Sequence, residues 1–163
     1  MRILAQRHNW AIFFENEQEE AVTVNGDRYR DMLKEFLFTK IEEEDIGNIL
    51  FQQDGATCHT AEAALDVLLL VFEDCIISRI ADAVWPTRSC DLTPLDYYLW
   101  SARKDKCYAD KPGTIDALKD NIREAIGEIR LHTIDNVLKS WTDRVGYCMA
   151  SRGSHLNEII FNY

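Results

Sequence analysis

The chain has 163 residues, of which 47% are hydrophobic and 28% are charged, and its formal net charge is −10. This length and apolar content can bury one sizeable core, which predicts one globular domain, and no apolar run approaches the length of a membrane-spanning helix. Because affinity for nucleic acid comes largely from Lys and Arg that neutralise phosphates, the acidic balance argues against strong DNA binding by this chain alone.

The cysteines are odd in number and widely spaced. None of the five forms a Cys-x-x-Cys pair that would indicate a zinc site. Unpaired cysteines are typical of a reducing compartment, so the sequence predicts an intracellular protein.

The first part of the chain predicts alternating strands and helices. Residues 11–14 form a short apolar run typical of a buried strand, the acidic run 15–20 predicts a solvated turn, and residues 21–24 predict a weak strand. After a turn at Asn25-Gly26, apolar residues recur at the spacing of a helix, at Tyr29, Met32, Leu33, Phe36 and Leu37.

A strand, a helix and a second strand are predicted next. Residues 49–51 are a short apolar run that ends near Asp54, which places this aspartate at the carboxyl end of a central strand. Apolar residues from 61 to 72 follow helical spacing, with Thr60 as the expected N-cap. Residues 75–78 then predict the second strand.

The remaining part predicts helices. Thr93 and Pro94 suit the N-cap and the first position of a helix, and Asp96 then lies in the first turn, where the helix dipole favours an anion. Helical periodicity also spans 115–129, with Thr114 as cap, and 134–148. The large apolar side chains near Asp96 are expected in the core, namely Trp85, Leu95, Tyr98, Leu99 and Trp100.

Asp54 and Asp96 are the candidate metal ligands. Hard divalent cations bind through one or two carboxylates together with substrate phosphates, so this pair predicts phosphodiester chemistry. Spacing alone leaves simpler interpretations open: an aspartate before Gly55 is typical of a turn, and Asp96 could serve only as a carboxylate at a helix N-terminus.

A second group of residues has side chains that could contact DNA. His59 follows Asp54 closely, and the basic candidates are Arg88, Arg103, Lys104 and Lys106. The alternative is that His59 is a partly exposed, hydrogen-bonded residue at a helix start and that the basic residues are ordinary surface charge.

Taken together, these segments resemble the catalytic domain of mariner-type transposases, a branch of the DDE/DDD nucleases. The family segment Gln-Gln-Asp-Gly/Asn-Ala-x-x-His matches residues 52–59, and Pro-x-Arg-Ser-x-Asp-Leu-x-Pro-x-Asp matches residues 86–96. Long shared series are far more specific than either short motif. The resemblance continues through residues 13–17, 22–26, 108–112 and 152–161.

The resemblance implies an α/β, ribonuclease H-like fold with a helical C-terminal part. Residues 1–10 would be an unrelated segment, and residues 11–163 a partial catalytic domain. Asp54 and Asp96 would be the second and third catalytic acidic residues, which hold Mg²⁺ or Mn²⁺ for DNA cleavage and strand transfer in the nucleus. The family's first acidic residue and its DNA-binding helix-turn-helix region lie upstream of the matched stretch, so we expect a truncated transposase with little activity of its own.

Two rival interpretations belong to other classes. The helices between Thr114 and Met149 could form a non-catalytic module that binds another protein, or the true product could begin upstream with a complete acidic triad. Loss of earlier strands would expose residues 11–14 as an edge strand and favour self-association. No organic cofactor, small-molecule substrate or membrane is expected.

Overall fold

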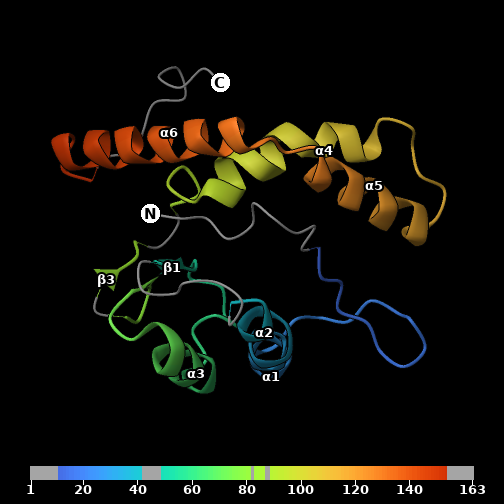
Figure 1. Ribbon diagram of the computed structural model, residues 1–163, viewed down its shortest axis with the longest axis horizontal. Coiled ribbons are helices and arrows are strands. Elements are labelled where there is room, and N and C mark those ends of the chain that lie inside the picture. Colours follow the sequence, from blue (N-terminus) through green and yellow to red (C-terminus); the bar gives the residue numbers. More distant parts are fainter. Residues whose placement is uncertain (1–10, 42–48, 82, 87–88, 154–163) are drawn as a thin grey trace. The chain divides into compact units, whose positions relative to one another are not determined.

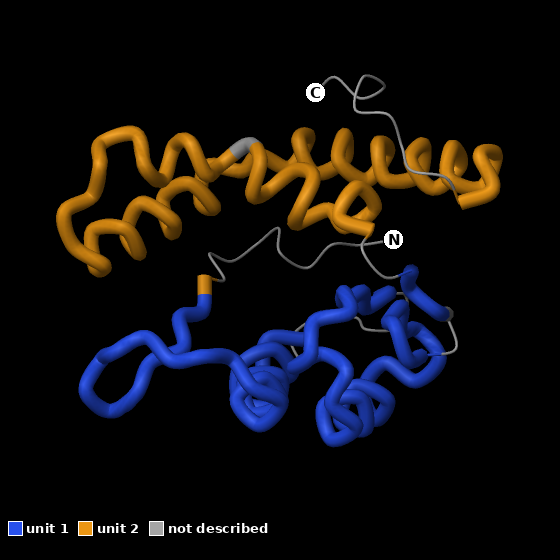
Figure 2. Tube along the Cα trace, turned by 180° about the vertical axis from the view of Figure 1, so that it is seen from behind, with its two compact units in different colours: residues 1–3, 12–88 blue, residues 4–11, 89–163 orange. Residues whose placement is uncertain are grey.

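The computed structural model describes residues 11–41, 49–81, 83–86 and 89–153. They divide into two compact units, the first holding described residues between 12 and 86 and the second holding Ala11 and those from 89 onward (Figure 2). Helices and parallel strands occur together in the first unit, and helices dominate the second (Figure 1). The α/β class is therefore confirmed, whereas the prediction of one partial domain over 11–163 stays a prediction.

The predicted strands at residues 11–14 and 21–24 are wrong. Among the described residues, pairing in this region is limited to one isolated antiparallel bridge between Glu15 and Ala21. The acidic run between them is a turn, as predicted, because the Asn16 side chain accepts hydrogen bonds from the backbone of Gln18 at 3.0 Å and of Glu20 at 2.9 Å. Such local side-chain bonds compete with a continuous ladder, which explains why the strand does not extend.

The next helical stretch confirms the predicted periodicity. It comprises α1 (Gly26–Met32), the π-helix η2 (Leu33–Leu37) and α2 (Phe38–Ile41). Asn25 caps its start, since its side chain accepts a hydrogen bond from the backbone of Arg28. Tyr29, Leu33 and Ile41 are buried on this stretch.

The strand–helix–strand prediction is also confirmed. Strand β1 (Phe51–Gln52) pairs in parallel with β2 (Ile76–Ser78), and α3 (Glu62–Phe72) connects them. A third strand, β3 (Ala83–Val84), pairs in parallel with β2, which gives the order β1-β2-β3. The parallel pair β1-β2 is joined by this crossover helix, and the local pattern was sufficient to predict that unit.

The core of the first unit forms where α3 covers the strands. Its buried residues are Ala64, Val67, Leu68 and Phe72, which recur at helical spacing. The Phe72 ring stacks on that of Phe51 with centroids 4.9 Å apart. The predicted side-chain cap at Thr60 is wrong: Ala61 is the N-cap residue, and the Thr60 hydroxyl donates to the Thr57 carbonyl.

The second unit begins with a π-helix. It contains η4 (Leu95–Trp100), α4 (Ser101–Tyr108), α5 (Ile115–Gly127) and α6 (Leu131–Ala150). The cap at Thr114 is confirmed, because its hydroxyl oxygen accepts a hydrogen bond from the backbone of Ala117 at 3.1 Å. Asn121 of α5 bonds the Cys107 carbonyl of α4 at 3.0 Å, which fastens these two helices together.

Two predicted core residues are exposed instead. Leu95 is 56% exposed and Trp100 is 58% exposed, whereas Trp85 is buried as predicted. The prediction for Leu95 assumed an α-helix, but η4 winds as a π-helix, so different residues share its inner face. The prediction for Trp100 rested only on the size of its side chain. None of the described helices combines the length and the apolar composition needed to cross a bilayer.

Candidate functional site

Asp54 lies just beyond the carboxyl end of β1, as the sequence predicted. The backbone of Gln53 still donates to Ile77 of β2 at 3.0 Å, and the chain then turns away from the sheet. One carboxylate oxygen of Asp54, Oδ1, accepts a hydrogen bond from the backbone of Ala56 at 3.0 Å. This bond to the residue two positions on is the Asx-turn that an aspartate before a glycine favours.

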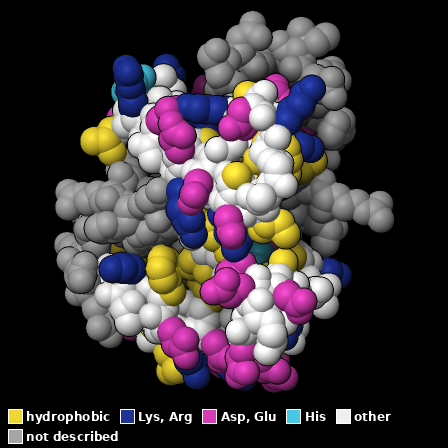
Figure 3. Space-filling model, turned by 90° about the vertical axis from the view of Figure 1, so that its right-hand side faces the viewer, with side chains coloured by type: hydrophobic (Ala, Val, Ile, Leu, Met, Phe, Trp, Pro, Cys, Tyr) yellow, Lys and Arg dark blue, Asp and Glu magenta, His cyan; other side chains and the backbone are white. Residues whose placement is uncertain are grey.

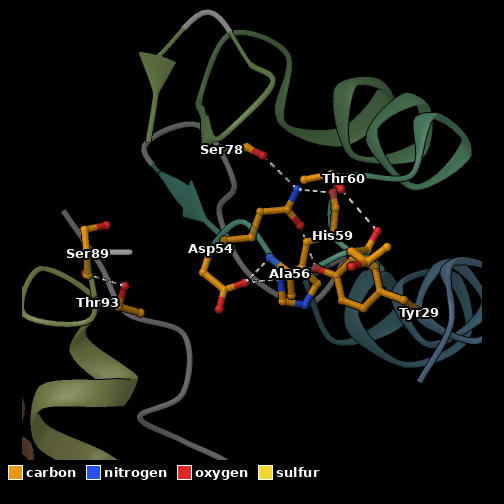
Figure 4. Close-up of polar contacts among 10 residues, drawn as sticks. Tyr29, Asp54, Ala56, His59, Thr60, Ser78, Ser89 and Thr93 are labelled. Carbon is orange, nitrogen blue, oxygen red and sulfur yellow. Dashed lines mark hydrogen bonds and ion pairs between the residues drawn. The ribbon is translucent and has the colours of Figure 1, made fainter. Parts of the chain in front are cut away.

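His59 provides a second contact to the same oxygen. Its Nδ1 lies 2.6 Å from Asp54 Oδ1, and since a carboxylate oxygen accepts, Nδ1 carries the proton (Figure 4). The Asp54 side chain is 45% exposed and the His59 side chain 25% exposed. The aspartate is thus oriented by two donors and still accessible, which suits a ligand.

Tyr29 packs against His59 from α1. The two ring centroids are 4.4 Å apart, and the Tyr29 hydroxyl donates to the Gln53 side chain at 2.8 Å. Burial raises the pKa of the Tyr29 phenol far above its ordinary value, and Cys58 and Asp54 shift it in the same direction. Tyr29 is therefore a neutral donor at any physiological pH.

Arg79 lies beside this loop and was missed by the sequence analysis. It follows β2 directly, and a Cβ built on Gly55 would lie 3.3 Å from its Cδ atom. The sequence could have indicated it, because Arg79 follows the predicted strand β2 as Asp54 follows β1. The carboxyl ends of parallel strands lie at the same edge of a sheet. The aliphatic part of the Arg79 side chain lies next to the glycine that follows the candidate ligand.

Asp96 is in the first turn of η4, as predicted. Its backbone donates to the Thr93 carbonyl at 2.9 Å, while the Thr93 hydroxyl donates to the Ser89 carbonyl instead of capping the helix. The predicted cap at Thr93 is therefore wrong: Pro94 is the N-cap residue of η4, and no described side chain caps it. π-Helical turns are frequent at functional sites, which fits a role for this segment.

Arg144 of α6 holds the segment that carries Asp96. It is 7% exposed, its guanidinium lies 4.2 Å from the centre of the Tyr97 ring, and its Nη1 donates to the Asp91 carbonyl at 3.0 Å. In return, the Tyr97 hydroxyl donates to the Val137 carbonyl of α6 at 3.0 Å. The sequence could have indicated that Arg144 is buried, because it lies seven positions after Val137, within the apolar stripe of this helix.

The predicted basic cluster is largely engaged within the second unit. Lys106 forms an ion pair with Glu128, and this hydrogen bond is the main reason that the pKa of Glu128 is lowered. Arg103 donates to the Tyr98 hydroxyl at 3.4 Å, and Lys104 is exposed. Arg88 lies outside the described residues. The cluster is thus less open to phosphates than its sequence indicated.

The two candidate ligands belong to different compact units, Asp54 to the first and Asp96 to the second. Within the described ranges, no group of three or more His, Cys, Asp or Glu side chains could hold a metal ion. A shared site for Asp54 and Asp96 therefore stays a prediction. All five cysteines are free thiols.

Comparison with protein-family models finds no match. No curated protein and no solved structure matches the chain either.

Proposed function

We propose that this chain is part of the catalytic domain of a mariner-type transposase with a ribonuclease H-like fold and has little activity of its own. The reaction class of the whole domain is metal-dependent DNA cleavage and strand transfer. The observation that carries the proposal is the position of Asp54. It stands at the carboxyl end of a strand in a parallel β1-α3-β2 unit, with one oxygen held by two donors. Ligands of open α/β sheets bind at this edge.

The donor set fits a hard cation. Asp54 and Asp96 would hold Mg²⁺ or Mn²⁺, and both metals prefer carboxylate oxygens completed by water and substrate phosphates. When bound, such an ion stabilises charge on the oxygens of a phosphodiester under displacement. The residues around Asp54 would orient the carboxylate, and Arg79 offers a cation for a phosphate.

DNA is the partner that this reaction requires, with the nucleus as its location. The contacts would come from His59 and Arg79 near Asp54 and from Lys104 on α4. Because the net charge is −10, affinity should be weak and should fall steeply with salt. Self-association would give each DNA molecule more contacts and partly offset this weakness.

A non-catalytic protein-interaction module is the second candidate. The engagement of Lys106 with Glu128 and of Arg103 with Tyr98 favours it, since these groups are then less available to phosphates. Leu131, Tyr147 and Met149 are also exposed apolar side chains of α6. A surface of this kind suits a protein partner better than a nucleic acid.

Manganese binding and DNA cleavage test the proposal. We would measure Mn²⁺ affinity by electron paramagnetic resonance and nicking of supercoiled plasmid, for the chain and for Asp54→Asn and Asp96→Asn. Each variant should lose at least about 10-fold in Mn²⁺ affinity. This is the lower end of the loss typical when a residue that orients a metal ligand is removed, and a ligand itself should matter at least as much. Asp66→Asn and Asp105→Asn, at exposed positions on α3 and α4, are matched controls.

Two outcomes would count against the metal site. The chain could show no saturable Mn²⁺ binding, or the control variants could lose as much affinity as the candidate ligands. Mn²⁺ binding that is lost in both candidate variants, with little or no plasmid nicking by the chain alone, is the result that the proposal expects.

A further inference from the structure

Gln53 is a buried side chain that makes three hydrogen bonds in the first unit. It is 5% exposed and directly follows β1. Its amide oxygen accepts from the Tyr29 hydroxyl at 2.8 Å, and its amide nitrogen donates to the His59 carbonyl at 2.9 Å and to the Ser78 hydroxyl oxygen at 3.1 Å. Burying an amide costs free energy unless it is hydrogen-bonded, and here it joins three separate segments.

These contacts hold His59 from two directions. The Gln53 amide donates to the backbone carbonyl of His59. The Tyr29 ring, whose hydroxyl donates to Gln53, contacts the imidazole at a tilt of 45° with the centroids 4.4 Å apart (Figure 4). Rotation of the imidazole would break the contact with Tyr29. Both the position and the rotamer of His59 therefore depend on the Gln53 amide.

His59 in turn directs the carboxylate of Asp54. Within the described part of the chain, both hydrogen bonds that Asp54 accepts go to Oδ1, one from His59 and one from the backbone of Ala56. The backbone donor belongs to the turn, whereas the imidazole reaches Oδ1 from a side chain, so two donors from different positions hold this oxygen. Oδ2 is then the oxygen presented outward.

We propose that Gln53 and Tyr29 are positioning residues, which act through His59 to aim Oδ2 of Asp54 at a divalent cation. This inference rests on the proposed metal site and deepens it. Neither residue would touch the metal or the DNA. Their effect would be transmitted through one imidazole, so it should vanish when that imidazole is absent.

The experiment uses two readouts. Nitrogen-15 NMR of the histidine side chains reports whether the His59 Nδ1 proton is held in a hydrogen bond, and electron paramagnetic resonance gives the Mn²⁺ affinity. The variants are Tyr29→Phe, which removes only the hydroxyl, and Gln53→Met, which removes the amide at similar volume. Tyr108→Phe, at a residue 53% exposed on α4, is the matched control.

We expect both variants to lose the protected Nδ1 signal and to weaken Mn²⁺ binding on the order of 10-fold, as for other groups that orient a ligand. In a His59→Ala background, Tyr29→Phe should cause no further loss, since the coupling runs through His59. A purely structural role would lower the melting temperature and leave both readouts unchanged in the folded variants.

An unchanged Nδ1 signal in folded Tyr29→Phe would overturn the proposal, whatever Mn²⁺ affinity is measured. Equal further losses in the His59→Ala background would overturn it too. A chain that shows the protected signal and its loss in the variants, but never binds Mn²⁺, would contradict the metal site and with it the proposed function. If Gln53→Met does not fold, Tyr29→Phe still decides.

Discussion

The two candidate aspartates are supported in different ways. Asp54 is oriented at its own carboxylate, by a backbone donor and an imidazole that a buried amide holds in place. The segment that carries Asp96 is fastened to α6 through Tyr97 and the buried guanidinium of Arg144. The contacts at Asp54 depend on a few polar atoms, whereas those around the Asp96 segment depend on packing between helices.

Charged side chains at the surface differ from these buried polar contacts. Acidic and basic side chains are interspersed over much of the face seen in Figure 3. Several are paired within one helix, as Lys119 with Asp116 and Arg123 with Asp120 on α5. Exposed pairs of this kind contribute little to stability. The buried polar contacts of Gln53 and Arg144 are therefore where substitutions should have large effects.

The largest expected effect is that of Arg144→Ala. It removes a buried hydrogen bond from a charged group and a desolvated cation–π contact, together worth about 3 kcal/mol of unfolding free energy. Urea unfolding followed by tryptophan fluorescence measures the loss. Lys139→Ala, at an exposed position of the same helix, should cost less than about 0.5 kcal/mol. Equal losses from the two variants would show that Arg144 does not hold the Asp96 segment.

Glycines of the two units should respond in opposite directions. A Cβ at Gly26 would lie 2.8 Å from the Cβ of Ala61, so Gly26→Ala should destabilise the chain by about 1–3 kcal/mol through overpacking. Gly146 of α6 has nothing within 4 Å of such a Cβ, so Gly146→Ala should stabilise by about 0.5–1 kcal/mol.

Chemical denaturation of both glycine variants checks these signs. Adding Ala61→Gly to Gly26→Ala removes the opposing methyl group and should restore most of the lost stability. If the double variant is no more stable than Gly26→Ala alone, the close packing of α1 on the start of α3 is not the cause.

The threonines before α3 and α5 should differ in a smaller way. Thr114→Ala removes a side-chain cap and should cost about 1 kcal/mol. Thr60→Ala removes only a bond to the Thr57 carbonyl and should cost less than about 0.5 kcal/mol. Thermal melts at matched pH measure both. A larger loss at Thr60 would mean that it caps α3 after all.

Ionisation of the Tyr29 phenol has an effect that appears only at alkaline pH. Its pKa is raised in the folded chain by burial, so its contribution is complete below the unfolded value of about 10 and is lost as pH rises above it. The unfolding free energy should therefore fall with pH above about pH 10. In Tyr29→Phe the slope of this fall should be smaller by the amount that corresponds to one proton. Denaturation at several alkaline pH values measures the slope, and identical slopes would contradict the burial of this group.

The sequence by itself determined what depends on neighbours along the chain. The β1-α3-β2 unit, α5, α6, the cap at Thr114 and the place of Asp54 after a strand all follow from periodicity and local chemistry. These features need only residues a few positions apart. Local patterns therefore carry the information for them.

Only the tertiary structure decided how the polar groups are satisfied. Gln53 meets Tyr29 and Ser78 from 24 and 25 positions away, and Arg144 meets Asp91 from 53 positions away. The exposure of Leu95 and Trp100 and the missing strand at residues 11–14 have the same origin. A buried donor or acceptor takes whichever partner folding brings to it, and a backbone extends a strand only where another strand lies beside it, so neither outcome is written in local spacing.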